Sequence, residues 1–200
     1  MSFSCSDLDP CTGDIRAGTF MSSKGRLKAY TPPPSEFYST PPSVLVKLRE
    51  HINFPSDFTY LEPCAGSGAV SRAIPGNWTL LELREEEKPT LEALGHEVIC
   101  PQDFLTWDAE GREWDYIITN PPFSLAQEFI EKSLTLSPRV IFLLRLSFLE
   151  SQKRYDFWQK HNPSIYVLSK RPSFVGGATD SCAYAWFFFG SPNPGTWKVI

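Results

Sequence analysis

The residue types best suited to chemistry in this chain lie in the segment Asn120-Pro121-Pro122-Phe123, which follows an apolar run at Asp115–Thr119 that predicts a buried strand. The Asn120 side-chain oxygen and the Pro121 carbonyl can both accept hydrogen bonds from one exocyclic amine, and the prolines restrict the backbone that carries them. Two acceptors raise the nucleophilicity of an amine, which attack on an electrophilic methyl group requires. Phe123 offers a ring face for stacking. A simple Asn-Pro turn with a core phenylalanine is the alternative interpretation.

A glycine-rich turn lies upstream, in the segment Tyr60–Val70, where the pattern predicts a strand, a turn and the start of a helix. Gly66 and Gly68 allow the backbone to turn sharply and to approach a ligand closely. The spacing is Gly-x-Gly-x-x-Ser, which lacks the third glycine of the dinucleotide fingerprint, and no Lys-Ser/Thr pair follows as in a nucleoside triphosphate loop. The turn alone therefore indicates a ligand-binding loop without naming its ligand.

Acidic residues follow successive predicted strands. Glu82 lies near the end of a strand predicted at Thr79–Leu83 and can accept hydrogen bonds from the two hydroxyls of a ribose. Asp103 follows a strand predicted at Glu97–Cys100 and can accept from an adenine amine, while Phe104 packs on the ring. Each acid alone is typical of a solvated surface, but their shared position after successive strands indicates a nucleoside site.

Strands and helices alternate along the chain, which predicts an α/β fold with a mostly parallel sheet, right-handed crossovers and helices on both faces. Seven strands are expected, at Thr59–Glu62, Thr79–Leu83, Glu97–Cys100, Tyr116–Thr119, Val140–Leu144, Ile165–Leu168 and Ala183–Phe189. Helices are expected at Ser43–His51, Ala69–Ala73, Glu85–Leu94, Leu125–Leu136 and Phe148–Lys160. Ligands of such sheets bind at the carboxyl ends of the strands, which is where the acids and Asn120 fall.

Taken in order, these motifs resemble the S-adenosylmethionine-dependent adenine-N6 methyltransferases, over a match that runs from Tyr38 to Phe123. The downstream segments Leu144–Ser151 and Arg171–Phe174 resemble the small DNA adenine methyltransferases of phages and prophages. The resemblance implies a Rossmann-like class I methyltransferase fold with S-adenosylmethionine as cofactor. It also implies methyl transfer to the N6 amine of a DNA adenine that is flipped into the Asn-Pro-Pro-Phe pocket.

The resemblance also assigns roles to single residues. The catalytic residues that it implies are Asn120, Pro121, Pro122 and Phe123. The cofactor-binding residues that it implies are Thr40 and Pro41 near the methionine end, Glu62, Cys64, Gly66 and Gly68 along the methionine and ribose, Glu82 on the ribose hydroxyls, Asp103 and Phe104 at the adenine, and Asn120.

The chain departs from the family in its length. Only 77 residues, 124–200, follow Phe123, and most of them are needed to complete the sheet. We therefore expect a catalytic domain at residues 35–200 without a sizeable target-recognition domain, preceded by a flexible, Gly-, Ser- and Pro-containing arm at residues 1–34. The recognised sequence stays open.

Composition fits a compact enzyme. The 200 residues are 42% hydrophobic, no apolar run is long enough for a membrane span, and no signal peptide is evident at the N-terminus. The five cysteines and three histidines are scattered and form no Cys-x-x-Cys pair, so no metal site is expected. This cysteine usage indicates a reducing cytoplasm, that of a bacterial host if a phage encodes the chain.

The net charge of −4 is unevenly distributed. Residues 139–200 contain eight Lys and Arg against three Asp and Glu, which leaves −9 for residues 1–138. This basic excess predicts a phosphate-facing surface beside the catalytic motif, and a solvated helix face is the equal alternative. The candidate nucleic-acid-binding residues are Arg145, Lys153, Arg154, Lys170 and Arg171.

Other functions share parts of this pattern. RNA adenine methyltransferases have the same catalytic motif, and related enzymes methylate glutamine amides in proteins, although Phe123 suits a nucleobase better. A catalytically silent nucleic-acid-binding accessory or anti-restriction protein belongs to a different class, against which the intact acceptor motif argues. A dinucleotide oxidoreductase is disfavoured by the missing third glycine. DNA is therefore the expected partner and RNA the alternative, with the oligomeric state open.

Overall fold

The structure, a computed structural model, describes residues 19–21, 27–29, 39–174 and 181–200. It divides the chain into two units, Met1–Phe37 and Tyr38–Ile200. In the first unit, strands β1 (Thr19–Met21) and β2 (Leu27–Ala29) form an antiparallel pair. Most of the arm predicted at residues 1–34 lies outside the described residues.

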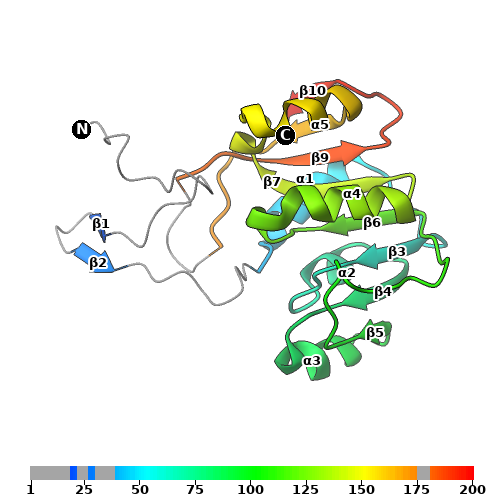
Figure 1. Cartoon of the computed structure of the whole chain (residues 1–200). Coiled ribbons are helices and arrows are strands. Elements are labelled where there is room, and N and C mark those ends of the chain that lie inside the picture. Colours follow the sequence, from blue (N-terminus) through cyan, green and yellow to red (C-terminus); the bar gives the residue numbers. More distant parts are fainter. Residues whose placement is uncertain (1–18, 22–26, 30–38, 175–180) are drawn as a thin grey trace. The chain divides into compact units, whose positions relative to one another are not determined.

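An eight-stranded sheet forms the centre of the second unit, in the order β10-β8-β9-β7-β6-β3-β4-β5 (Figure 1). The strands are β3 (Thr59–Glu62), β4 (Asn77–Leu81), β5 (Glu97–Ile99), β6 (Tyr116–Thr119), β7 (Val140–Arg145), β8 (Ser164–Val167), β9 (Tyr184–Phe189) and β10 (Trp197–Val199). All neighbours pair in parallel except β9, which is antiparallel to both β7 and β8. The predicted mostly parallel sheet is therefore confirmed.

The predicted number of seven strands was wrong by one, because β10 was not expected. This edge strand has three residues, and all three are exposed, so it lacks both the apolar run and the alternation that mark a strand in a sequence. It also follows directly on a turn that contains Pro192, Pro194 and Gly195, and such residues favour an irregular connection.

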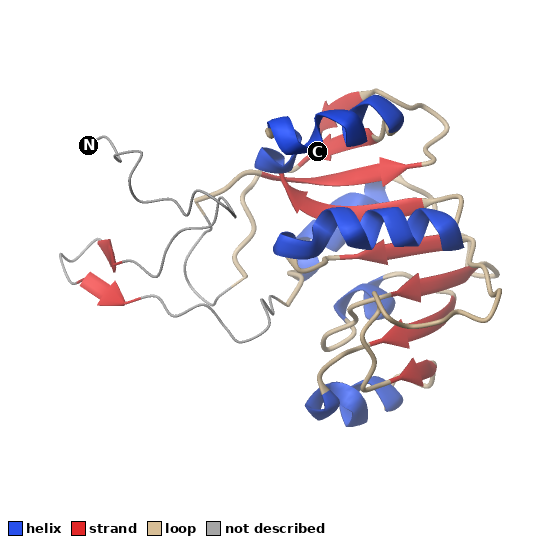
Figure 2. Cartoon of the chain, in the orientation of Figure 1, coloured by secondary structure: helices blue, strands red, loops and turns tan. Residues whose placement is uncertain are grey.

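Helices cover both faces of the sheet, and strand alternation separates two apolar cores. In β7, Ile141 and Leu143 pack in the core under α1 (Pro42–His51), α2 (Ala69–Ala73) and α3 (Lys88–Glu92). Val140, Phe142 and Leu144 pack in the core under α4 (Ala126–Leu136) and α5 (Tyr155–Lys160). Figure 2 shows α4 in front of the sheet and α1 behind it. Successive strand residues point to opposite faces, so the continuous apolar run of β7 serves both cores.

Two predicted helices are shorter than expected. The segment 85–94 begins as a 3-10 turn, η2 (Glu85–Glu87), and α3 starts only where Pro89 can occupy the first helical turn. The segment 148–160 consists of η4 (Leu146–Leu149), η5 (Gln152–Arg154) and α5. Ser151 is extended there and its hydroxyl accepts from the Lys153 N–H at 3.2 Å, so a new helical turn begins at this cap.

The carboxyl ends of β3, β4, β6 and β7 meet at one edge of the sheet because these strands run in parallel. The first residue of antiparallel β9, Tyr184, reaches the same edge, where it is the register partner of Arg145 at the end of β7. Within the part of the chain that the structure describes, no helix is long and apolar enough to cross a membrane.

Candidate active site

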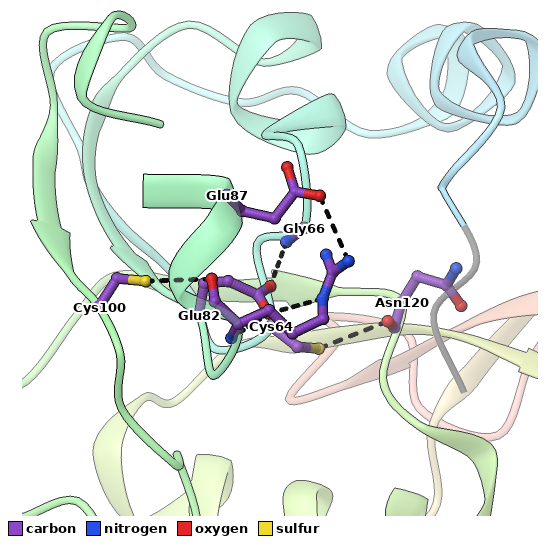
Figure 3. Close-up of polar contacts among 7 residues, drawn as sticks. Cys64, Gly66, Glu82, Glu87, Cys100 and Asn120 are labelled. Atoms are coloured by element: carbon purple, nitrogen blue, oxygen red, sulfur yellow. Dashed lines mark hydrogen bonds and ion pairs between the residues drawn. The ribbon is translucent and has the colours of Figure 1, made fainter. Parts of the chain in front are cut away.

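The glycine turn between β3 and α2 is held by a side chain from the neighbouring strand. Gly66 and Gly68 have φ angles of +54° and +79°, which favour glycine. The Gly66 N–H donates to Glu82 Oε2 at 2.6 Å, and Glu82 follows β4 (Figure 3). The sequence assigned Glu82 to ribose hydroxyls, and the structure shows that this buried carboxylate also fixes the turn.

Arg84 is a member of the site that the sequence analysis missed. Its backbone N–H and its Nε donate to Glu82 Oε1 at 2.9 and 3.1 Å, and its Nη1 lies 3.3 Å from Glu87 (Figure 3). Both oxygens of Glu82 are thus hydrogen-bonded within the protein, and Oε2, which accepts from Gly66, retains a second lone pair for another donor. The only signal in the sequence was a run of charged residues after the strand, which is usual for a solvated loop.

Glu62 is a buried acid at the end of β3, with 2% of its surface exposed. Burial raises the pKa of its carboxyl well above the ordinary value, the charge of Glu82 raises it further, and backbone N–H groups of Ser71 and Val70 oppose the rise. Among the described residues, no hydrogen-bond partner lies against Oε2 of Glu62. A buried carboxylate oxygen that lacks a hydrogen-bond partner favours a cationic or hydrogen-bond-donating ligand.

Cys64 connects the glycine turn to the Asn120–Phe123 segment. Its Sγ lies 2.8 Å from Thr119 Oγ1. The thiol donates to the Asn120 carbonyl at 3.4 Å (Figure 3). Burial raises the pKa of the Cys64 thiol, so the group remains protonated and acts as a donor. The structure therefore brings two motifs that are 55 residues apart in sequence into direct contact.

The Asn120–Phe123 segment follows β6, Pro122 has φ −56° and ψ 122°, and Phe123 begins the 3-10 turn η3 (Phe123–Leu125). Pro121 is buried, while Asn120 and Phe123 are half-buried. The Phe123 ring packs 5.8 Å from the Tyr184 ring, and the Arg145 guanidinium lies 4.8 Å from its centroid.

The two residues predicted at the adenine end differ in burial, because Asp103 is half-buried and Phe104 is buried. Asp103 Oδ1 accepts from the Leu105 N–H at 2.9 Å, which orders the loop after β5. Phe104 is only 2% exposed, and its ring lies 5.1 Å from the Phe129 ring and 5.1 Å from Lys132 Nζ. Phe104 is thus a core residue with little ring surface left for a ligand.

Lys132 on α4 is a second residue of this region that the sequence did not indicate. Its Nζ donates to the carbonyls of Leu105 and Trp107, so α4 holds the loop that carries Asp103. At the other predicted end of the cofactor, Thr40 is buried just before α1, and the Pro41 carbonyl accepts from the Val44 N–H at 3.2 Å. Hydrogen bonds to backbone carbonyls thus hold both segments in place.

The five candidate phosphate-binding residues fall into different environments. Lys153, Lys170 and Arg171 are exposed, as a phosphate contact requires. Arg154 instead donates to the carbonyls of Phe148 and Glu150 at 2.8 and 3.2 Å, and its guanidinium lies over the Phe148 ring. Arg145 packs on Phe123. In the described part of the chain, His, Cys, Asp and Glu side chains form no cluster of three or more that could hold a metal ion.

No protein-family model matches the chain, and no curated protein matches it in sequence. Solved structures do match. A candidate RNA methyltransferase from Pyrococcus horikoshii has a TM-score of 0.62 and 19% identity, covering 78% of this chain and 86% of its own. The fold is that of class I methyltransferases.

Further members of this fold match with similar scores. The modification subunit of a candidate type I restriction enzyme from Vibrio vulnificus has a TM-score of 0.62 and 15% identity, covering 82% of this chain and 47% of that subunit. A candidate class I S-adenosylmethionine-dependent methyltransferase from Listeria monocytogenes has a TM-score of 0.58 and 13% identity, covering 79% of this chain and 63% of its own. At these identities the likeness is one of fold.

Proposed function

We propose that this protein transfers a methyl group from S-adenosylmethionine to the N6 amine of adenine in DNA. The observation that carries the proposal is the contact of Cys64 with Thr119 and the Asn120 carbonyl, which joins the glycine turn to the Asn-Pro-Pro-Phe segment. A cofactor seated at the turn and an amine held at Asn120 would be neighbours at one edge of a methyltransferase-type sheet. The methyltransferases among the similar structures support the same chemistry.

The residues at this edge fit the cofactor. When bound, S-adenosylmethionine supplies a methyl group on a positively charged sulfur, which a nucleophile can attack. The buried Glu62 Oε2 has no partner among the described residues and would accept from the ammonium of the methionine portion. Glu82 and the Gly66–Gly68 turn would hold the ribose, and Asp103 would hold the adenine. Thr40, Pro41 and Cys64 would line the methionine side.

The catalytic work of the chain is positioning and hydrogen bonding. Asn120 Oδ1 and the Pro121 carbonyl accept from the target amine and keep its lone pair directed at the methyl donor. Pro121 and Pro122 limit the backbone freedom of this segment. Cys64 stays protonated, so it supplies no nucleophile, and the amine proton leaves to solvent water.

The adenine must leave a duplex, or be presented in a single strand, to reach this segment. Flipping costs a few kcal/mol, and stacking on Phe123 offsets roughly 1–3 kcal/mol of it. The exposed Lys153, Lys170 and Arg171 would bind phosphate without reading sequence. RNA adenine is the second candidate substrate, favoured by the likeness to a candidate RNA methyltransferase.

The test is an assay with methyl-labelled S-adenosylmethionine and, separately, duplex DNA, single-stranded DNA and RNA of mixed sequence. We expect label in DNA N6-methyladenine, and loss of most of this label with the Asn120→Ala variant, while cofactor binding persists in calorimetry. Label only in RNA would replace the substrate and keep the chemistry. Cofactor binding without label in any nucleic acid would contradict the proposal in favour of a silent nucleic-acid-binding protein.

A further inference from the structure

Three neighbouring strands bring an arginine and two rings together beside the proposed catalytic segment. Arg145 is the last residue of β7, and β6, which leads into Phe123, pairs with β7 on one side. On the other side β9 pairs antiparallel, so that its first residue, Tyr184, is the register partner of Arg145. The sheet topology therefore places both Phe123 and Tyr184 beside the Arg145 side chain.

The Arg145 side chain is held in a definite orientation. Its guanidinium carbon lies 4.8 Å from the centroid of the Phe123 ring, within cation–π range. Its Nε donates to the Tyr184 hydroxyl at 3.2 Å. Tyr184 is itself fixed, because it is 1% exposed and its ring packs 5.1 Å from the Phe174 ring and 5.8 Å from the Phe123 ring.

These contacts differ from those of a phosphate-binding arginine. A phosphate contact requires the charged end to reach into solvent, whereas Arg145 is half-buried and folded onto an aromatic ring. A planar guanidinium can stack on a ring face and donate from Nε at the same time. Lysine lacks both the plane and the Nε donor, so the two residues are not equivalent at this position.

We propose that Arg145 is a positioning residue that fixes the ring of Phe123 for stacking with the target base. This role rests on the proposed function, because it assigns the base to Phe123. Tyr184 anchors the guanidinium, the guanidinium covers and orients the ring, and the oriented ring receives the base. Arg145 thereby acts on catalysis through Phe123 rather than through the DNA backbone.

The experiment compares Arg145→Lys, Arg145→Gln and Tyr184→Phe with the wild type, and Arg49→Lys on the exposed surface of α1 serves as the matched control. Steady-state methylation of DNA gives kcat and KM, and DNA binding at several salt concentrations gives the salt slope. We expect Arg145→Lys to lower kcat about tenfold and Tyr184→Phe about threefold. Cofactor affinity and the salt slope should stay unchanged in both variants.

The outcomes separate positioning from phosphate binding. Near-wild-type kcat in Arg145→Lys, with a salt slope that is about one unit smaller in Arg145→Gln, would make Arg145 a phosphate contact and overturn the inference. Tyr184→Phe removes only a hydroxyl, so it tests the anchor even if the Arg145 variants fold poorly. A wild type that methylates no nucleic acid would overturn the proposed function itself, and this role with it.

Discussion

Asn120 and Phe123 are close in sequence, but the proposed reaction requires different roles of the two side chains. In the proposed reaction Asn120 would supply an acceptor that matters most as charge develops on the amine, whereas Phe123 would supply a stacking surface. We expect Asn120→Ala to lower kcat by about 10²–10³-fold and Phe123→Ala by roughly tenfold. Steady-state methylation of DNA, with cofactor affinity measured by calorimetry, checks both values. A larger loss in Phe123→Ala than in Asn120→Ala would refute the division of roles.

Glu62 should limit the stability of the unliganded protein. Burial raises the pKa of the Glu62 carboxyl above its ordinary value of 4.5. The contribution of the neutral carboxyl to the free energy of unfolding is therefore fully present when the pH is below 4.5. It is lost as the pH rises through the raised pKa, because a charge must then be buried. We expect Glu62→Gln to raise the free energy of unfolding by roughly 1–3 kcal/mol at high pH and to have little effect at low pH.

The same substitution should weaken cofactor binding, because the amide cannot attract a cationic ammonium as a carboxylate does. Thermal unfolding of wild type and Glu62→Gln from about pH 5 to about pH 9, with calorimetric titration of S-adenosylmethionine, measures both effects. A variant that is less stable than the wild type at every pH would contradict this prediction, because it would show that the Glu62 carboxyl mainly stabilises the fold.

At the scale of elements, the turn between β3 and α2 depends on Gly68 for conformation and for space. Gly68 has φ +79°, and a Cβ there would lie 2.5 Å from Leu94 Cδ1 and 3.3 Å from Leu91 Cδ2. Gly95 is a matched control, because it has φ +75° but nothing within 4 Å of its Cβ position. Both substitutions by alanine carry the strain of left-handed backbone, about 1–2 kcal/mol, and only one adds a clash.

We therefore expect Gly68→Ala to destabilise the protein more than Gly95→Ala, by about a further 1–2 kcal/mol. It should also lower cofactor affinity, since displacement of α2 moves the turn that would hold the ribose. Chemical denaturation and calorimetry give the two numbers. Equal destabilisation by the two variants would mean that Leu94 and Leu91 move aside without cost.

The elements that sequence predicted best are those with a strong local signal. Strands β3 and β6 and helix α2 have the predicted bounds, because an apolar run or a glycine turn marks each of them. The edge strand β10 was missed because all of its residues are exposed. The long helix predicted at 148–160 was interrupted at Ser151, where a hydroxyl cap outweighed the helical spacing of the apolar residues.

Side-chain contacts across the sheet were beyond prediction for a different reason. The hydrogen bond of Glu82 with Gly66 and the packing of Arg145 on Phe123 join segments that are 16 and 22 positions apart. Such contacts depend on strand order and register, which composition and periodicity do not contain. The sequence could name the chemistry of these residues but could not distinguish a phosphate contact from a ring contact at Arg145.

At the scale of the molecule, the charge distribution suits a nucleic-acid substrate only if the exposed basic residues do the binding. Residues 139–200 carry the basic excess while the chain as a whole has a net charge of −4. Arg154 contributes little to such a surface, because it donates to the backbone carbonyls of Phe148 and Glu150. Lys170 and Arg171 follow β8 at the same edge of the sheet as Arg145 and are exposed.

These environments predict opposite effects for neighbouring charges. Lys170→Gln and Arg171→Gln should each weaken DNA binding to the same extent for every sequence and reduce the log–log salt slope by about one unit. Arg154→Gln should leave the slope unchanged and lower the free energy of unfolding by roughly 1–3 kcal/mol, because it removes charged hydrogen bonds to two carbonyls. Fluorescence anisotropy with labelled DNA over a range of salt concentrations, together with denaturant titration, measures both quantities. A salt slope that falls in Arg154→Gln and not in the other two variants would contradict this assignment. It would place the phosphate-binding surface at η5, directly before α5.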